Sequence, residues 1–268
     1  MTAPILTYEG ADRLAADRPN LGLVYDKRFD GWVRSPAWHI AKPSPDRNPR
    51  LDWLLKFAST THRAGTQLPS GYRALADRLL ADNAARRSAL FAGTGALVID
   101  LTLRGCFISG LGAAHVLETG FIWDRNLGVP MIPGSSIKGC VRAWASEWRG
   151  PLQGAVAALF GNQKTAGEVV VHDALPVVVP ELEVDIVNPH YGPYYQGKSD
   201  PADYLSPVPV FFLAVKDGAT FRTAIAPRVA GKTDALEQAF ALLAEAVAVT
   251  GLGGKTAVGY GRFEAKRS

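Results

Sequence analysis

The clearest hydrophobic pattern in this sequence follows a proline-glycine break at residues 133–134. Apolar side chains then recur at helical spacing, on one face of the predicted helix: Ile137, Val141, Trp144 and Trp148. Ser135 or Ser136 is suited to cap the first free backbone N–H groups of that helix. The pattern predicts an amphipathic helix over residues 136–149 whose apolar face is buried.

From Gly95 onward the surrounding periodicity changes from helical to extended. The runs that we interpret as strands are 96–107, 115–123, 168–173 and 175–187. Two further runs, 208–216 and 219–227, flank Asp217 and Gly218 and predict a hairpin. A last helix is predicted from Asp234, with a final strand after the glycines that follow it.

Residues 1–94 lack such strand signals and contain seven prolines, which divide this part into short pieces. Helical periodicity occurs at 51–57 and 70–91, and residues 20–29 form a short segment that is either helical or extended. We therefore expect a mostly helical N-terminal extension packed on a main α+β domain at residues 95–268.

Composition narrows the class of protein. The chain has 268 residues, of which 47% are hydrophobic and 20% charged, so it can bury a substantial core. The net charge of +4 permits an anionic partner without requiring one. Two cysteines, Cys106 and Cys140, exclude a disulfide framework and a cysteine-rich zinc site. No signal peptide or long apolar run is evident, so we expect a cytoplasmic protein with no membrane partner.

The start of the 136–149 helix has the chemistry of a phosphate site. Lys138 and Arg142 lie one turn apart near the positive end of the helix dipole, where backbone donors also converge. On its own, this pattern is more typical of an ordinary capped helix with two solvated cations. A second glycine-rich segment, at residues 251–263, favours the phosphate site over the ordinary capped helix.

This second segment carries five glycines around a lysine and a threonine. A Walker loop is excluded because Val249 occupies the position five residues before Gly254 where that motif requires glycine. A dinucleotide fingerprint is excluded because the segment follows a helix and enters a strand. A helix C-cap explains Gly251 but not the other four glycines. We therefore expect a bare backbone that approaches a ribose-phosphate chain.

The predicted RNA contacts come from these two segments. They are Gly134, Ser135, Ser136, Lys138, Arg142, Gly251, Gly253, Gly254, Lys255, Thr256, Gly259, Gly261 and Arg262.

Catalytic and metal-binding signals are sparse. The five histidines are scattered without metal-ligand spacing, so we expect neither a metal nor another cofactor. His115 is the best single candidate for acid-base work on RNA. The long loop at 188–209 carries tyrosines that can stack on unpaired bases or pack on a neighbouring protein, and the sequence favours neither.

Three glycine-rich segments, 110–112, 130–139 and 251–261, resemble the RAMP superfamily of CRISPR proteins. Within it, residues 20–27, 119–124 and 254–261 are most similar to the sixth subunit of Cmr-type, type III-B effector complexes. The resemblance implies a ferredoxin-like domain of the RNA-recognition type, elaborated by insertions. It also implies a part in antiviral defence.

The function implied is a non-catalytic RNA-binding subunit that holds the 3′ side of the guide CRISPR RNA at the head end of the complex. Its partners would be the target RNA, the repeating backbone subunit, the first RAMP subunit and the small helical subunit. Residues 188–209 would act as a thumb that inserts between or caps bases. In RNA-cleaving backbone relatives a catalytic aspartate lies where this chain has Glu118, six residues before Asp124. The resemblance gives that glutamate no catalytic role.

Two alternatives remain open. One is a metal-independent endoribonuclease of the CRISPR RNA-processing type that uses His115 or Glu118. The other is a purely structural assembly adaptor whose glycine loops serve packing.

Overall fold

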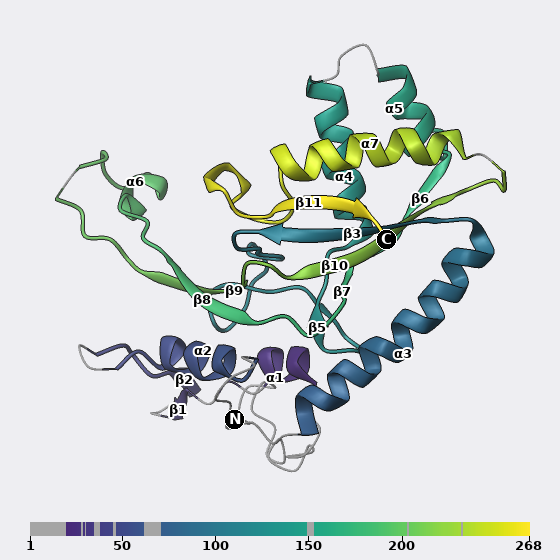
Figure 1. Ribbon diagram of the computed structural model, residues 1–268. Coiled ribbons are helices and arrows are strands. Elements are labelled where there is room, and N and C mark those ends of the chain that lie inside the picture. Colours follow the sequence, from purple (N-terminus) through teal and green to yellow (C-terminus); the bar gives the residue numbers. More distant parts are fainter. Residues whose placement is uncertain are drawn as a thin grey trace.

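The computed structural model of the protein describes residues 20–27, 29, 31–34, 38–44, 47–61, 71–148, 153–202, 204–231 and 233–268. A central antiparallel sheet carries helices on both sides, and a two-stranded arm projects from it (Figure 1). This confirms the expected mixture of helices and antiparallel strands. Part of the predicted extension at residues 1–94, including residues 1–19, lies outside the described residues.

The central sheet has the strand order β11-β3-β10-β6, and β7 also pairs with β10. The strands are β3 (Leu97–Arg104), β6 (Val169–Val171), β7 (Leu175–Pro176), β10 (Thr220–Pro227) and β11 (Arg262–Arg267). β3 alternates as predicted, because Ile99, Leu101 and Leu103 are fully buried while the residues between them are partly exposed. All pairings in this sheet are antiparallel.

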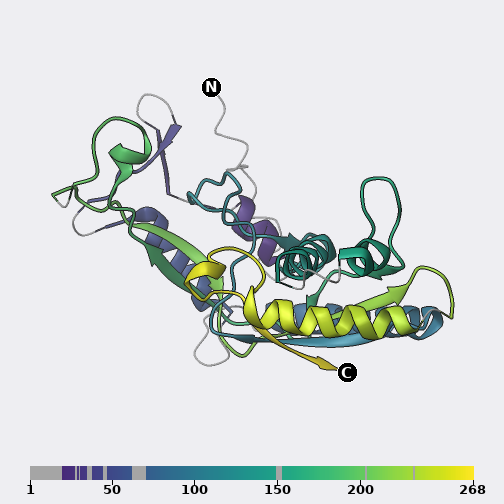
Figure 2. The ribbon, with the colours of Figure 1, turned by 90° about the horizontal axis from the view of Figure 1, so that it is seen from above.

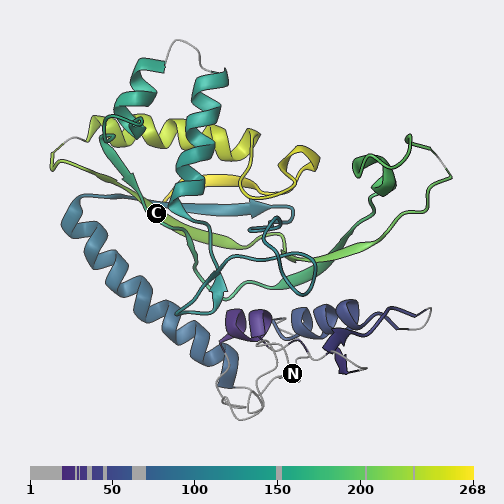
Figure 3. The same ribbon diagram turned by 180° about the vertical axis from the view of Figure 1, so that it is seen from behind.

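Three helices lie on one face of this sheet, as Figures 1 and 2 show. They are α4 (Gly134–Trp148), α5 (Gln153–Phe160) and α7 (Asp234–Val249). α7 packs on β11 and on α4, burying Leu236, Leu243 and Val247. The long helix α3 (Gly71–Thr94) runs along the other side and contacts β10 (Figure 3). Among the described residues, no helix combines the length and apolarity needed to span a bilayer.

The N-terminal elements are α1 (Leu21–Lys27), α2 (Pro49–Ser59) and a short strand pair, β1 (Trp32–Arg34) and β2 (Trp38–Ile40). α2 begins at the proline because Asn48 accepts hydrogen bonds from two backbone N–H groups of the first turn. Tyr25 and Phe57 are buried in the same hydrophobic cluster as the central sheet. The N-terminal elements therefore share a core with the rest of the chain.

The projecting arm consists of β8 (Leu182–Val187) and β9 (Val210–Val215), paired antiparallel over their whole length. Its tip carries the short helix α6 (Gly192–Tyr195) and the loop predicted at 188–209 (Figures 1 and 3). Two tyrosines there are strongly exposed, Tyr195 at 72% and Tyr204 at 83%. α2 packs against the base of the arm through both of its strands.

Two strand predictions were wrong. Residues 115–122 form a looped connection, and only Trp123–Asp124 of the predicted strand pairs, as β4, with β5 (Val129–Pro130). The predicted hairpin about Asp217 also does not form, because β9 pairs with β8 whereas β10 pairs with β3. The turn at 217–218 instead carries the chain from the arm to the central sheet, where the Gly218 N–H donates to the Leu103 oxygen.

One face prediction needs a correction as well. Ile137, Val141 and Trp144 are buried on the inner face of α4 as expected. Trp148 is 69% exposed and stacks on Trp144, with ring centroids 5.6 Å apart. Trp148 lies beyond the edge of the hydrophobic core, so this last apolar position of the helix faces solvent.

Candidate functional site

Helix α4 begins at Gly134, beneath the end of β6. A Cβ atom at this position would overlap the main-chain oxygen of Val171, so only glycine fits there. The Gly134 N–H donates to the carboxylate of Asp173 at 2.7 Å. The acceptor at this helix start is therefore Asp173 and neither Ser135 nor Ser136, which lie exposed within the first turn, so the predicted serine cap was wrong.

Asp173 also connects this helix start to α3. The Arg87 guanidinium donates to the main-chain oxygen of Asp173 and lies over the Phe91 ring, 5.2 Å from its centroid. Burial lowers the pKa of Arg87, and burial together with the Arg87 charge lowers the pKa of His172. The N-terminal end of α4 is thus fixed by neighbours before any ligand is present.

The glycine-rich loop follows α7. Gly251 ends the helix as predicted, with a φ of 79° and an N–H that donates to the Ala246 oxygen at 3.1 Å. Gly253 and Gly261 also have positive φ, and a Cβ at either position would overlap a main-chain oxygen of the protein itself. Close packing of the loop therefore accounts for two glycines that a helix C-cap does not explain.

The outer face of α4 and the glycine loop together form a groove of about 390 Å³. α4 contributes four small residues at helical spacing: Ser136, Gly139, Cys140 and Ala143. The Cys140 thiol donates to the Gly251 oxygen at 3.3 Å, which joins the helix to the loop. A Cβ on Gly139 would have nothing within 4 Å, so the groove is open above this position.

The connection between β3 and β4 forms the remaining wall of the groove, through Ser109, Gly110 and Ile122. The groove-lining residues include no charged side chain, so their polar surface is main chain, hydroxyl and thiol. Lys255, which precedes the lining residue Thr256, has a left-handed backbone with φ of 58°. Its ammonium group lies over the Phe212 ring, 5.3 Å from the centroid.

Two hydrogen bonds connect this region to β8 of the arm. The Tyr260 hydroxyl donates to the Asp185 carboxylate, and the Cys106 thiol donates to the Glu183 carboxylate at 2.6 Å. Burial and these carboxylates raise the pKa of Cys106 to about 12 and also raise the pKa of Tyr260. Both groups therefore remain protonated donors at neutral pH, and the glycine loop and the arm are held together.

A family model of the RAMP superfamily matches residues 83–264. The chain belongs to the RAMP superfamily. The resemblance stated from the sequence motifs is thereby confirmed.

The most similar relatives include two archaeal proteins. This RAMP chain is 32% identical to the CRISPR system Cmr subunit Cmr6 of Pyrococcus furiosus, over 58% of this chain and 64% of the relative. It is 30% identical to the CRISPR system CMR subunit Cmr6 of Saccharolobus solfataricus, over 56% of this chain and 49% of the relative. The matches thus span between about half and two thirds of these relatives.

A solved structure is similar in fold. It is a chain of the cryo-EM structure of the type III-B Cmr-β bound to cognate target RNA, with a TM-score of 0.58. The match covers 75% of this chain and 69% of that chain at 22% identity, so the likeness concerns the fold alone.

The predicted contacts are distributed unevenly around the groove of this RAMP chain. Those that line it are Ser136, Gly251, Gly253 and Thr256. Lys138 and Arg142 are on α4 but are not among the lining residues. The Arg262 guanidinium is bound to the main-chain oxygens of Val249 and Thr256 and holds the two ends of the loop together. The remaining positions are Gly134, Ser135, Gly254, Lys255, Gly259 and Gly261, none of which lines the groove.

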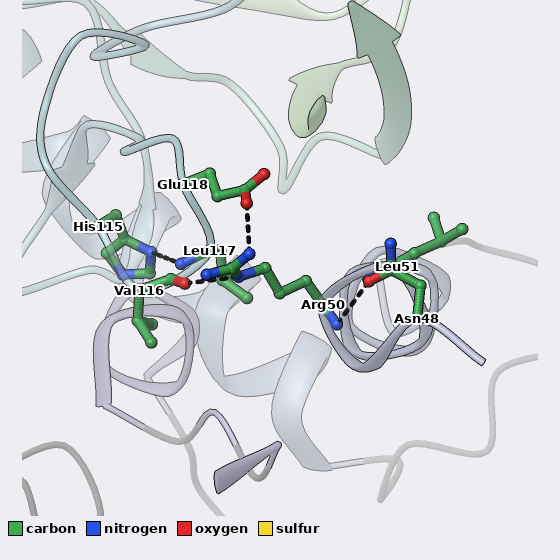
Figure 4. Close-up of polar contacts among 7 residues, drawn as sticks. All are labelled: Asn48, Arg50, Leu51, His115, Val116, Leu117 and Glu118. Atoms are coloured by element: carbon green, nitrogen blue, oxygen red, sulfur yellow. Dashed lines mark hydrogen bonds and ion pairs between the residues drawn. The ribbon is translucent and has the colours of Figure 1, made fainter. Parts of the chain in front are cut away.

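The acid-base candidate His115 does not line the groove either. Its ring stacks on Tyr25 of α1 with centroids 4.7 Å apart, and its side chain is 12% exposed. Its Nδ1 accepts the Leu117 N–H at 3.2 Å (Figure 4). Its Nε2 lies 3.7 Å from the Asp26 carboxylate. These contacts give His115 a packing role between the loop and α1.

Glu118 lies at the tip of the same loop with a φ of 75°, which is unusual for a residue other than glycine. Its carboxylate forms an ion pair with Arg50 of α2, whose Nε donates to the Val116 oxygen at 3.2 Å (Figure 4). Within the described ranges, no group of three or more potential metal ligands comes together. The residues proposed for the nuclease alternative are thus held by their own partners, outside the groove.

The sequence analysis missed two parts of the groove. Cys140 and Ala143 continue the helical spacing of the small residues Ser136 and Gly139, and this signal was available in the sequence. The wall formed by the connection between β3 and β4 could not be predicted, because no local sequence signal indicates that residues 109–110 and 122 meet at the groove.

Proposed function

We propose that this RAMP-superfamily chain is a non-catalytic, RNA-binding subunit of a type III-B Cmr effector complex. The observation that carries the proposal is the groove, in which the small-residue face of α4 meets the glycine loop. Its main-chain and hydroxyl groups suit the sugar-phosphate backbone of a single strand, which proteins hold without reading its sequence. Cations on flanking segments, Lys138, Arg142 and Lys255, would supply the salt-dependent attraction.

The finer assignments follow from the relatives. Cmr6 is a subunit of the CRISPR Cmr system in both archaeal relatives, and the similar solved fold belongs to a complex with target RNA. We infer that this chain holds the 3′ side of a guide CRISPR RNA at the head end, beside sibling RAMP subunits and the target RNA. The arm tip at 188–209 then acts as the thumb, with exposed Tyr195 and Tyr204 available to stack on bases.

We also interpret residues 95–268 as a ferredoxin-like domain with insertions, and residues 1–94 as its N-terminal extension. The strand order supports this interpretation, because β11 lies beside β3 and β10 lies between β3 and β6. The two crossover helices, α4 and α7, cover the same face of the sheet (Figure 1).

A groove-filling substitution tests the RNA proposal. Gly139→Phe should place a ring in open space and weaken the binding of single-stranded RNA by about tenfold or more, because it occupies the path of the strand. Gly93→Phe is the matched control, since Gly93 is also a helical glycine with nothing within 4 Å of an added Cβ, but on α3. Fluorescence anisotropy with a labelled oligonucleotide measures both variants.

Equal affinities of the two variants would contradict the groove assignment, provided that both unfold at the same temperature as the wild type. A specific observation favours a second candidate, the structural adaptor: Gly253 and Gly261 are required by packing inside the protein. In that case Gly139→Phe would leave RNA affinity unchanged and instead reduce co-purification with sibling subunits.

A further inference from the structure

A second cavity, of about 230 Å³, lies at the base of the arm. The start of α2, the loop tip at Leu117 and Glu118, and the beginning of β9 enclose it. Its charged side chains are Arg50 and Glu118, which form an ion pair and are 29% and 38% exposed. Its apolar walls include Val208 and Phe211. The cavity has room for one ring system, with an ion pair on one wall.

This cavity lies on the connection that also lines the RNA groove. Ser109, Gly110 and Ile122 of the connection border the groove, and its tip borders the cavity. Glu118 at that tip and Lys255 of the glycine loop are the non-glycine residues with positive φ in the described part of the chain. Strained backbone of this kind concentrates where a protein holds a ligand.

The ion pair leaves hydrogen-bonding groups for a ligand. Arg50 uses Nη1 for Glu118 and Nε for Val116, while the bond to Glu118 involves its Oε1 (Figure 4). The second carboxylate oxygen and the other guanidinium nitrogen are not used by these bonds. Because Oε1 also keeps a second lone pair, the carboxylate can still accept two hydrogen bonds, beside a guanidinium donor at the edge of an apolar cavity.

We propose that this cavity binds one extruded guanine base of the RNA that the groove holds; the inference rests on the proposed function. Guanine presents two adjacent donors, N1–H and the 2-amino group, which match the Glu118 carboxylate. Its O6 is an acceptor that matches the Arg50 guanidinium. Adenine, cytosine and uracil each offer the carboxylate only one donor group, so they form fewer of these bonds.

Two other ligands fit the cavity less well. A phosphate group would be repelled by the Glu118 carboxylate, because Arg50 is already paired with it. A metal ion would meet the Arg50 guanidinium beside a single carboxylate, which is too few ligands for a cation site. The apolar walls, which include Phe211, favour the faces of a base.

The test uses the full chain and a set of twelve-nucleotide RNAs built from adenosine and cytidine. One guanosine replaces an adenosine at each position in turn, and anisotropy gives the affinities. We expect the RNAs whose guanosine can reach the cavity to bind about tenfold more tightly than the RNA without guanosine, and inosine, which lacks the 2-amino group, to lose most of the gain. Glu118→Gln should abolish this preference, because an amide offers one acceptor oxygen in place of two.

A second variant addresses the cavity without altering the ion pair. Val208→Trp fills the cavity from the arm and should also remove the guanosine preference. Gly139→Phe should lower the affinity for every RNA while the ratio between guanosine and adenosine persists. If the wild type binds all RNAs equally, the guanine site is wrong and the proposed function stands. If it binds none of them, both proposals fail.

Discussion

The start of α4 offers the sharpest test of the geometry around the proposed groove. Asp173→Ala removes the carboxylate that accepts the Gly134 N–H at 2.7 Å, while the main-chain oxygen that binds Arg87 remains. Loss of a capping acceptor costs about 0.5–2 kcal/mol. Because the Asp173 side chain is exposed, we expect about 1 kcal/mol, which for a chain of this size lowers the unfolding temperature by about 2–4 °C.

The assay combines calorimetry with amide hydrogen exchange. Protection of the Gly134 amide should fall in Asp173→Ala, because its acceptor is lost. Asp173→Asn is the control: its side-chain oxygen still accepts the bond, so it should lose less stability than alanine and retain protection. The reasoning is refuted if the Gly134 amide remains as protected in the alanine variant as in the wild type.

The remaining predictions concern the glycine loop and pH. Gly259→Ala should cost about 1–2 kcal/mol, the penalty for a left-handed residue, because an added Cβ has open space there. Gly261→Ala should cost more, since its Cβ would also overlap a main-chain oxygen; equal losses in urea unfolding would contradict this. The pKa of His172 is held below its ordinary 6.5 by burial and by Arg87, so protonation opposes folding. The stability that neutral His172 contributes to the folded state is present above pH 6.5 and is lost as the pH falls below that value. The wild type should therefore lose more stability than His172→Gln between pH 7.5 and 5.5, and parallel losses would reject the assignment.

The sequence predicted the helices well because helical periodicity reports burial within one element. The predicted helices at 51–57 and 70–91 lie within or largely coincide with α2 and α3, and residues 20–29, left open between helix and strand, contain α1. Strand predictions failed where the pairing partner of a segment is distant in the sequence. The apolar residues at 115–123 belong to a loop that packs on α1, with His115 against Tyr25 and the Tyr25 hydroxyl donating to the Thr119 oxygen. Extended patterns alone do not specify which strand a segment joins.

The site was predictable only in part, for a related reason. Two of the three segments of the proposed groove, α4 and the glycine loop, were identified from local chemistry, and the structure brings them together. The acceptor for Gly134 was not identifiable, because Asp173 is 39 residues further along the chain. From the sequence we expected an external anion or a neighbouring serine to accept hydrogen bonds from the N–H groups at the helix start. In the folded chain the Asp173 carboxylate is the acceptor for Gly134.

That internal carboxylate bears on the kind of ligand the proposed groove can hold. A site for a single phosphate gathers helix-start N–H groups and cations around one point. Here the Gly134 N–H binds Asp173, and the Gly254 N–H binds the Ile108 oxygen. Arg262 is bound to the main-chain oxygens of Val249, at the end of α7, and Thr256. The groove itself is lined by uncharged residues, many of them small. Such a surface offers little to an isolated anion, but it suits a polymer held by many weak contacts along its length.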